Sequence, residues 1–119
     1  MGGDNATDLA ALAKAAAVSF RARGETFVGP CTAGMDFIYM EKDFAAGSLE
    51  SYTNVSVHPY RSGPPESVVD DWATLRALVA KYAPGGHVND LIDGEWGYTS
   101  ADPPCRCALG GQLGSAAHA

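Results

Sequence analysis

Helical and strand-like patterns alternate three times along the chain, and this alternation constrains the fold more than any other feature. Apolar residues spaced by threes and fours predict helices at residues 8–23, 35–46 and 66–82. Short apolar runs that end near Gly or Pro predict strands at residues 26–30, 53–60 and 88–95. Strands separated by single helices pair in parallel through right-handed crossovers. The pattern therefore predicts an α/β fold with three parallel strands and three helices.

The apolar residues of each predicted helix indicate which side packs against the sheet. The first helix has a face of Leu9, Leu12, Ala16 and Phe20. The second helix has apolar surface from Phe37, Ile38, Met40 and Phe44. The third helix has a stripe of Val68, Trp72, Leu75, Val79 and Tyr82. We expect Gly24 and Gly47 to end the first two helices and Asp36 to be a first-turn charge of the second.

Three strands and three helices make an unfinished architecture. A parallel sheet needs both faces covered, and a three-stranded sheet leaves two edges without a partner. We therefore expect residues 8–100 to be a piece of a larger α/β fold. The flanking residues 1–7 and 101–119 are expected to be disordered, because the tail is rich in Ala, Gly, Pro and Ser and has no periodicity. We also expect that the chain can associate with itself through these open sheet edges.

Composition narrows the classes of partner. The formal net charge is -6 and no basic patch is visible, so a nucleic-acid partner is not expected. No apolar run reaches the length of a membrane span, and residues 1–7 do not resemble a signal peptide. Cys31 stands alone, and Cys105 and Cys107 lack the usual spacing of a zinc pair. Neither a metal nor a cofactor is expected.

Polar and aromatic side chains follow the predicted strands at their carboxyl ends. His58 and Tyr60 close the second strand, and Glu95 closes the third, with Trp96 and Tyr98 directly after it. Because the carboxyl ends of parallel strands meet at one edge of a sheet, we expect His58, Tyr60 and Glu95 to converge on one pocket. Each residue also has a structural interpretation: Glu95 as a solvated loop acid, His58 and Tyr60 as packing residues, and the other two as rim or core aromatics.

Three motifs, two of which carry these residues, resemble consecutive strand ends of clan A glycoside hydrolases, which are retaining enzymes with a (β/α)8 (TIM) barrel. They are Gly24-Glu25-Thr26-Phe27-Val28-Gly29-Pro30, Ser56-Val57-His58-Pro59-Tyr60-Arg61 and Gly94-Glu95-Trp96-Gly97-Tyr98. The cellulase-like and xylosidase-like branches are the most similar. The resemblance covers residues 8–100 and implies a partial barrel from the helix after strand four to the end of strand seven.

The resemblance implies a role for each residue of the constellation. Glu95 falls at the position of the family's catalytic nucleophile, and His58 and Tyr60 fall where strand six binds the nucleophile and the sugar. Trp96 and Tyr98 are candidates for contact with a β-glycoside substrate. The family's acid/base Glu has no counterpart here, so we expect the chain alone to be inactive. The alternative is a non-catalytic α/β module that binds carbohydrate or associates with itself.

Overall fold

Three parallel strands form the main sheet of this protein. The computed structural model describes residues 5–85, 87, 89–98, 107–108 and 112–113. The strands are paired in the order β1 (Val28–Thr32), β2 (Asn54–Val57) and β3 (Asp90–Asp93). The helices are α1 (Asn5–Ala22), α2 (Phe37–Ala45) and α3 (Val69–Tyr82), with short 3-10 turns η1 (Ser48–Glu50) and η2 (Pro65–Val68). The predicted α/β class, with helices and parallel strands in alternation, is confirmed.

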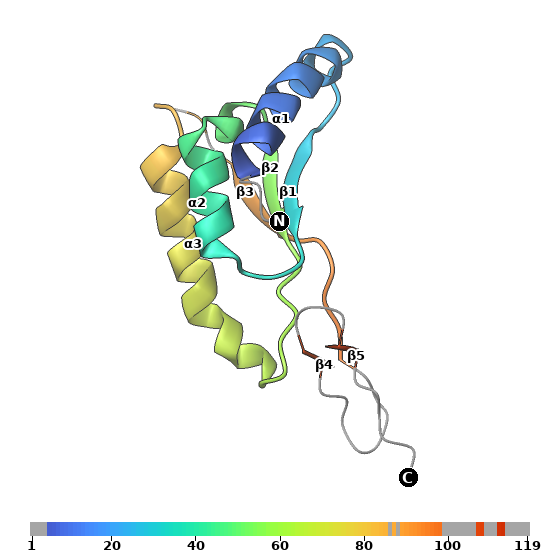
Figure 1. Ribbon diagram of the computed structural model, residues 1–119, viewed down its shortest axis with the longest axis vertical. Coiled ribbons are helices and arrows are strands. Elements are labelled where there is room, and N and C mark those ends of the chain that lie inside the picture. Colours follow the sequence, from blue (N-terminus) through green and yellow to red (C-terminus); the bar gives the residue numbers. More distant parts are fainter. Residues whose placement is uncertain (1–4, 86, 88, 99–106, 109–111, 114–119) are drawn as a thin grey trace.

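All three helices contribute to a single core on one face of β2 (Figure 1). Val55 and Val57 point to the same face because side chains alternate along a strand. They pack in a cluster with Ala13, Met40, Phe44, Leu49, Tyr52, Leu75 and Val79. Burying a Val or Leu side chain completely contributes roughly 1.5–3 kcal/mol, so this cluster is the main apolar source of stability. The described helices therefore form one layer against one sheet face.

The buried face of α1 differs from the predicted one. The buried residues are Ala6, Ala10, Ala13 and Ala17. Leu12, predicted to face the core, is 65% exposed. Small Ala side chains let the backbone of α1 approach its neighbours α2 and η1 closely, and that close packing outweighs the burial of one larger residue. The prediction that α1 packs mainly through Leu9, Leu12, Ala16 and Phe20 is therefore wrong.

The other two helices follow their predicted patterns more closely. In α3 and η2 the core positions are Val68, Leu75 and Val79, as the stripe predicted. In α2, Ile38 is 76% exposed, so its predicted contribution to the core is wrong. Asp36 lies one residue before α2 and caps it, because its Oδ1 accepts a hydrogen bond from the Tyr39 N–H at 3.0 Å. Gly47, with φ of +84°, follows α2 as predicted.

The strands begin and end at different residues from those predicted. The strand β1 extends to Thr32, because it is an edge strand that tolerates Pro30 and shifts register between Pro30 and Thr32. Cys31, expected after the strand, lies within it and is exposed. The strand β2 ends at Val57, and the N–H of Tyr60 then bonds to the His58 carbonyl at 2.7 Å. This local turn ends the extended backbone before the predicted residue.

The flanking segments are only partly described. The helix α1 includes Asn5–Thr7, which were expected to be disordered with the rest of residues 1–7. Most of the predicted disordered tail, residues 101–119, lies outside the described residues, as do Cys105 and residues 1–4. Within that tail β4 (Cys107–Ala108) and β5 (Gln112–Leu113) pair antiparallel. Among the described residues, no helix combines the length and apolarity needed to cross a bilayer.

Candidate active site

Backbone hydrogen bonds at the carboxyl end of β2 hold the segments that follow the three strands together. The His58 N–H donates to the Thr32 carbonyl at 2.8 Å, at the end of β1. The Gly94 N–H donates to the Val57 carbonyl at 3.0 Å, just after β3. Val57 is also in register with Asp93. The residues that follow β2 and β3 are therefore neighbours at the carboxyl edge of the sheet.

Glu95 meets Tyr60 and His58 at this edge, as the sequence predicted. The Tyr60 hydroxyl donates to Glu95 Oε1 at 2.5 Å. The other carboxylate oxygen, Oε2, lies 3.8 Å from His58 Nδ1, a separation suited to an ion pair when the imidazole is protonated and too long for a hydrogen bond. The Glu95 side chain is 62% exposed and that of His58 is 24% exposed. One carboxylate oxygen is thus held by a donor while the group remains open to solvent.

Gly94 gives this arrangement its space. A Cβ at position 94 would lie 2.3 Å from Ser56 Oγ and 3.2 Å from two atoms of the His58 ring. Carbon atoms do not approach a hydroxyl oxygen at such a distance without displacement of one of them. The absence of a side chain at Gly94 therefore allows His58 to lie beside the backbone that carries Glu95.

Trp96 and Tyr98 contact each other, and Tyr98 also bonds to the loop after β2. Their ring centroids are 5.8 Å apart and the rings are tilted by 53°. The Tyr98 hydroxyl donates to the Gly63 carbonyl at 2.9 Å, and the side chain is among the exposed large ones, at 45%. The indole Nε1 of Trp96 is buried and has no partner among the described residues. Tyr98 therefore connects the segment that carries Glu95 to the loop after β2.

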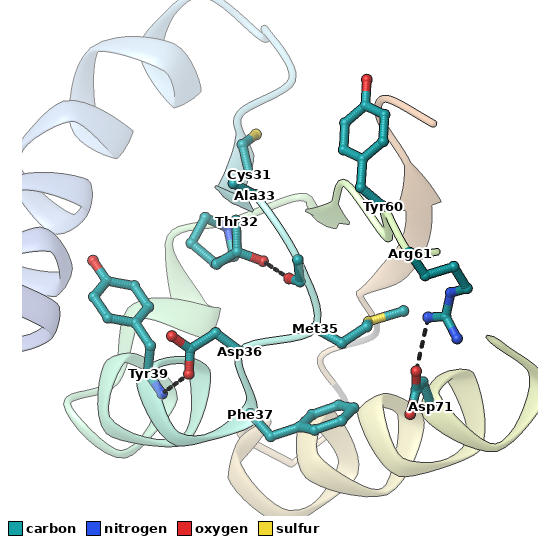
Figure 2. A pocket seen from close by; sticks show the side chains of 12 residues that line it. Cys31, Thr32, Ala33, Met35, Asp36, Phe37, Tyr39, Tyr60, Arg61 and Asp71 are labelled. Atoms are coloured by element: carbon teal, nitrogen blue, oxygen red, sulfur yellow. Dashed lines mark hydrogen bonds and ion pairs between the residues drawn. The ribbon is translucent and has the colours of Figure 1, made fainter. Parts of the chain in front are cut away.

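A pocket of about 800 Å³ lies at the carboxyl ends of β1 and β2 and reaches the starts of α2 and α3 (Figure 2). We call it the β1–β2 pocket. Tyr60 is the residue it shares with the Glu95 constellation. Glu95 and His58 do not line it, so the prediction that all three residues converge on one pocket is not confirmed for this pocket. Its lining consists of Pro30, Cys31, Thr32, Ala33, Gly34, Met35, Asp36, Phe37, Tyr39, Tyr60, Arg61 and Asp71.

Arg61 and Asp71 form an ion pair on the wall of this pocket that sequence reasoning missed. Arg61 Nη2 lies 2.8 Å from Asp71 Oδ2, and both side chains are partly shielded from solvent, at 16% and 35% exposed. The same guanidinium donates through Nε to the Pro59 carbonyl at 3.2 Å and through Nη1 to Ser67 Oγ at 3.2 Å. The available signal was the position of Arg61 directly after His58-Pro59-Tyr60. These contacts fix the backbone that presents Tyr60.

Asp43 is a second carboxylate that sequence reasoning missed, and it lies in the helical layer. It is fully buried, and its Oδ2 accepts hydrogen bonds from Ser48 Oγ at 2.7 Å and from the Tyr52 hydroxyl at 3.4 Å. Its Oδ1 is buried with no partner in the described part of the chain. Loss of hydration on burial raises the pKa of Asp43 above its usual value, although both hydrogen bonds oppose this shift. The same burial and the nearby Asp43 raise the pKa of Tyr52.

The part of the chain that the structure describes contains no ready set of metal ligands. No group of three His, Cys, Asp or Glu side chains there is arranged to hold a metal ion. The chemistry that the carboxyl edge can perform is that of an exposed carboxylate, a phenol that donates to it and an imidazole close by. No family model, curated protein or solved structure matches this chain.

Proposed function

We propose that this chain is part of a retaining glycoside hydrolase in which Glu95 is the catalytic nucleophile. The observation that carries the proposal is the contact between the Tyr60 hydroxyl and Glu95 Oε1, 2.5 Å long, at the carboxyl edge of a parallel sheet. Barrel enzymes keep their chemistry at that edge. The substrate class that we propose is a β-glycoside, and neither a metal nor a cofactor takes part.

The geometry suits a nucleophile that must remain ionised. In retaining hydrolysis a carboxylate attacks the anomeric carbon, and a second carboxyl group first protonates the leaving oxygen and then activates water. A phenol that donates to Oε1 stabilises the charged carboxylate and leaves Oε2 for the attack. His58, 3.8 Å from Oε2, is placed to orient the carboxylate or to bind a sugar hydroxyl. Trp96 and Tyr98 offer aromatic surface for the sugar.

The partial (β/α)8 barrel is the finer part of the proposal. It is supported by the single layer of helices, since α1, α2 and α3 contribute to one core on the same face of β2. In a barrel all helices lie outside the strands, whereas a doubly wound sheet has helices on both faces. The acid/base carboxylate has no counterpart in the resemblance, so we propose that net hydrolysis requires a group beyond the three matched segments.

The test uses a substrate that needs no acid. Dinitrophenolate leaves a sugar without protonation, so dinitrophenyl β-glucoside, β-cellobioside and β-xyloside should transfer their sugar to Glu95 of the intact chain. The bond from the anomeric carbon to the phenolic oxygen breaks and the bond to Glu95 Oε2 forms. Added azide, which needs no base, should then displace Glu95 and release a β-glycosyl azide. We expect dinitrophenolate release that depends on azide, with a β-configured azide product detected by NMR.

Two variants decide between hydrolase and binding module. Glu95→Gln should abolish azide-dependent release, and Asp93→Asn, which changes an exposed carboxylate two residues earlier, should retain it. If all three sugars bind but no glycosyl azide forms, the non-catalytic module is correct and the nucleophile assignment is wrong.

Self-association through strand pairing is opposed by Pro30 in β1 and by the exposed Asp90 and Asp93 in β3.

A further inference from the structure

The β1–β2 pocket is of a size and composition that suit a small-molecule ligand. Its volume, about 800 Å³, falls within the range of about 300–1,000 Å³ that is usual for ligand sites. Figure 2 shows the Met35 side chain directed toward the Arg61–Asp71 pair, with the Phe37 ring on the side of α3. Pro30, Ala33 and the ring of Tyr60 add further apolar surface.

The polar side chains of this lining are already engaged within the protein. Thr32 Oγ1 donates to the Gly34 carbonyl at 2.7 Å, and Asp36 caps α2 through the Tyr39 N–H. Arg61 is bound by Asp71, by Ser67 Oγ and by the Pro59 carbonyl. A ligand that competed for these groups would have to break contacts that position the surrounding loops. Apolar contact is therefore what the wall offers at least cost.

The charge of the wall selects against anions. Asp36 and Asp71 contribute two carboxylates and Arg61 contributes one guanidinium, which already pairs with Asp71. The formal net charge of the chain is also -6. An anionic ligand would meet repulsion and would find the one cation of this wall already neutralised. A neutral ligand meets neither penalty.

Tyr60 connects the pocket to Glu95. Its ring lines the pocket, and its hydroxyl donates to Glu95 Oε1. We propose that the β1–β2 pocket binds the neutral aromatic part of a ligand, next to the group that contacts Glu95. If the proposed glycosidase function holds, this aromatic part is the aglycone of the substrate; that identification rests on the proposed function, and the binding of a neutral aromatic ring does not.

A matched pair of fluorescent probes tests the proposal on the full chain. N-phenyl-naphthylamine is neutral, and anilinonaphthalene sulfonate has the same ring system with an added negative charge. We expect the neutral probe to bind saturably, with its emission enhanced, and the anionic probe to bind at least roughly tenfold more weakly. Ala33→Glu replaces apolar wall surface with a carboxylate that a bound ring would desolvate, so it should weaken binding of the neutral probe. Leu12→Glu adds the same charge at an exposed position of α1 and should not weaken it.

Methionine methyl groups locate the probe without any variant. The chain has three Met residues, of which Met35 lines the pocket and Met40 is completely buried in the core. With isotope-labelled methyl groups, the neutral probe should shift the Met35 signal much more than the signal of the buried Met40. Absence of saturable binding, or equal shifts at Met35 and Met40, would overturn the proposal. Glycosyl transfer to Glu95 is measured in a separate experiment. Failure of the pocket proposal therefore does not decide the glycosidase proposal, and failure of the glycosidase proposal does not decide the pocket proposal.

Discussion

Asp43 and Glu95 each accept a hydrogen bond from a tyrosine hydroxyl, but their surroundings are opposite. Asp43 is fully buried in the helical layer, with Ser48 and Tyr52 as donors and with Oδ1 unpartnered among the described residues. Glu95 is 62% exposed at the carboxyl edge of the sheet, with Tyr60 as its donor. The same pair of chemical groups is therefore enclosed in the core in one place and accessible to solvent in the other. Burial, more than the hydrogen bond itself, therefore distinguishes the two carboxylates.

Matched tyrosine variants should separate the two regions most strongly. Tyr60→Phe removes the donor that orients Glu95, and we expect azide-dependent release of dinitrophenolate to fall by roughly tenfold to a hundredfold. The unfolding free energy should change little, because the contact is exposed. Tyr52→Phe should do the reverse, with release unchanged and a loss of about 0.5–1.5 kcal/mol in stability. Denaturant melts and initial rates, measured on both variants, check this; equal effects on rate would contradict the separation.

Removing the buried carboxylate of Asp43 should give the next largest effect, a loss of unfolding free energy. Asp43→Ala leaves the hydroxyls of Ser48 and Tyr52 without their acceptor, and we expect the unfolding free energy to fall by about 1–3 kcal/mol. Asp93→Ala, at an exposed position of β3, is the matched control and should change stability by less than about 0.5 kcal/mol. Urea unfolding followed by circular dichroism provides the measurement. Equal stabilities of the two variants would show that the Asp43 contacts contribute nothing.

Adding a methyl group at Gly94 should disturb the carboxyl edge by a smaller amount. Gly94→Ala places a Cβ against Ser56 Oγ and the His58 ring, so we expect a loss of about 1 kcal/mol or somewhat more from overpacking. Gly97→Ala, where a Cβ meets nothing within 4 Å, is the control and should be close to neutral. The His58 ring signals in NMR should shift in the first variant only. Unchanged His58 signals in Gly94→Ala would mean that the edge has more room than the structure shows.

The smallest effect should be the part of the pH dependence of stability that comes from Asp43, measured as the difference between the natural chain and Asp43→Asn. The folded pKa of Asp43 is raised by burial, so the protonated form is favoured in the folded state. The corresponding stabilisation is fully present below the ordinary Asp pKa of about 3.9, and it is lost as pH rises through the raised pKa of the folded state. Asp43→Asn cannot ionise, so it should gain stability relative to the natural chain as pH rises through this window. Parallel pH profiles of the two proteins would contradict the raised pKa.

The sequence predicted the parts of the molecule that depend on chain order. Parallel strands separated by helices bring their carboxyl ends to one edge, so the meeting of His58, Tyr60 and Glu95 followed from their positions after β2 and β3. The apolar stripe of α3 was predicted from local spacing, because its large apolar residues alternate clearly with polar ones. The glycosidase role of Glu95 stays a prediction.

The parts that sequence reasoning missed depend on tertiary partners. In α1 the abundant Ala residues give little contrast between faces, so the larger Leu12 was assigned to the core although close packing buries Ala10 and Ala13 instead. Asp43 resembles an ordinary surface charge of a helix until η1 brings Ser48 against it. The Arg61–Asp71 pair joins the loop after β2 to α3, so the sequence position of Arg61 does not identify Asp71 as its partner. Such contacts follow from packing and have no periodic signature.

The most direct test of the central claim is to trap the glycosyl group on its residue. A dinitrophenyl β-glycoside with fluorine on the ring carbon next to the anomeric centre should react with the intact chain and stop at the glycosylated protein, because fluorine slows displacement of the sugar. We expect one added fluoroglycosyl group, located on Glu95 by peptide mass spectrometry and absent from Glu95→Gln. An adduct on another carboxylate, such as Asp36 or Asp71, or no adduct on the natural chain, would contradict this claim.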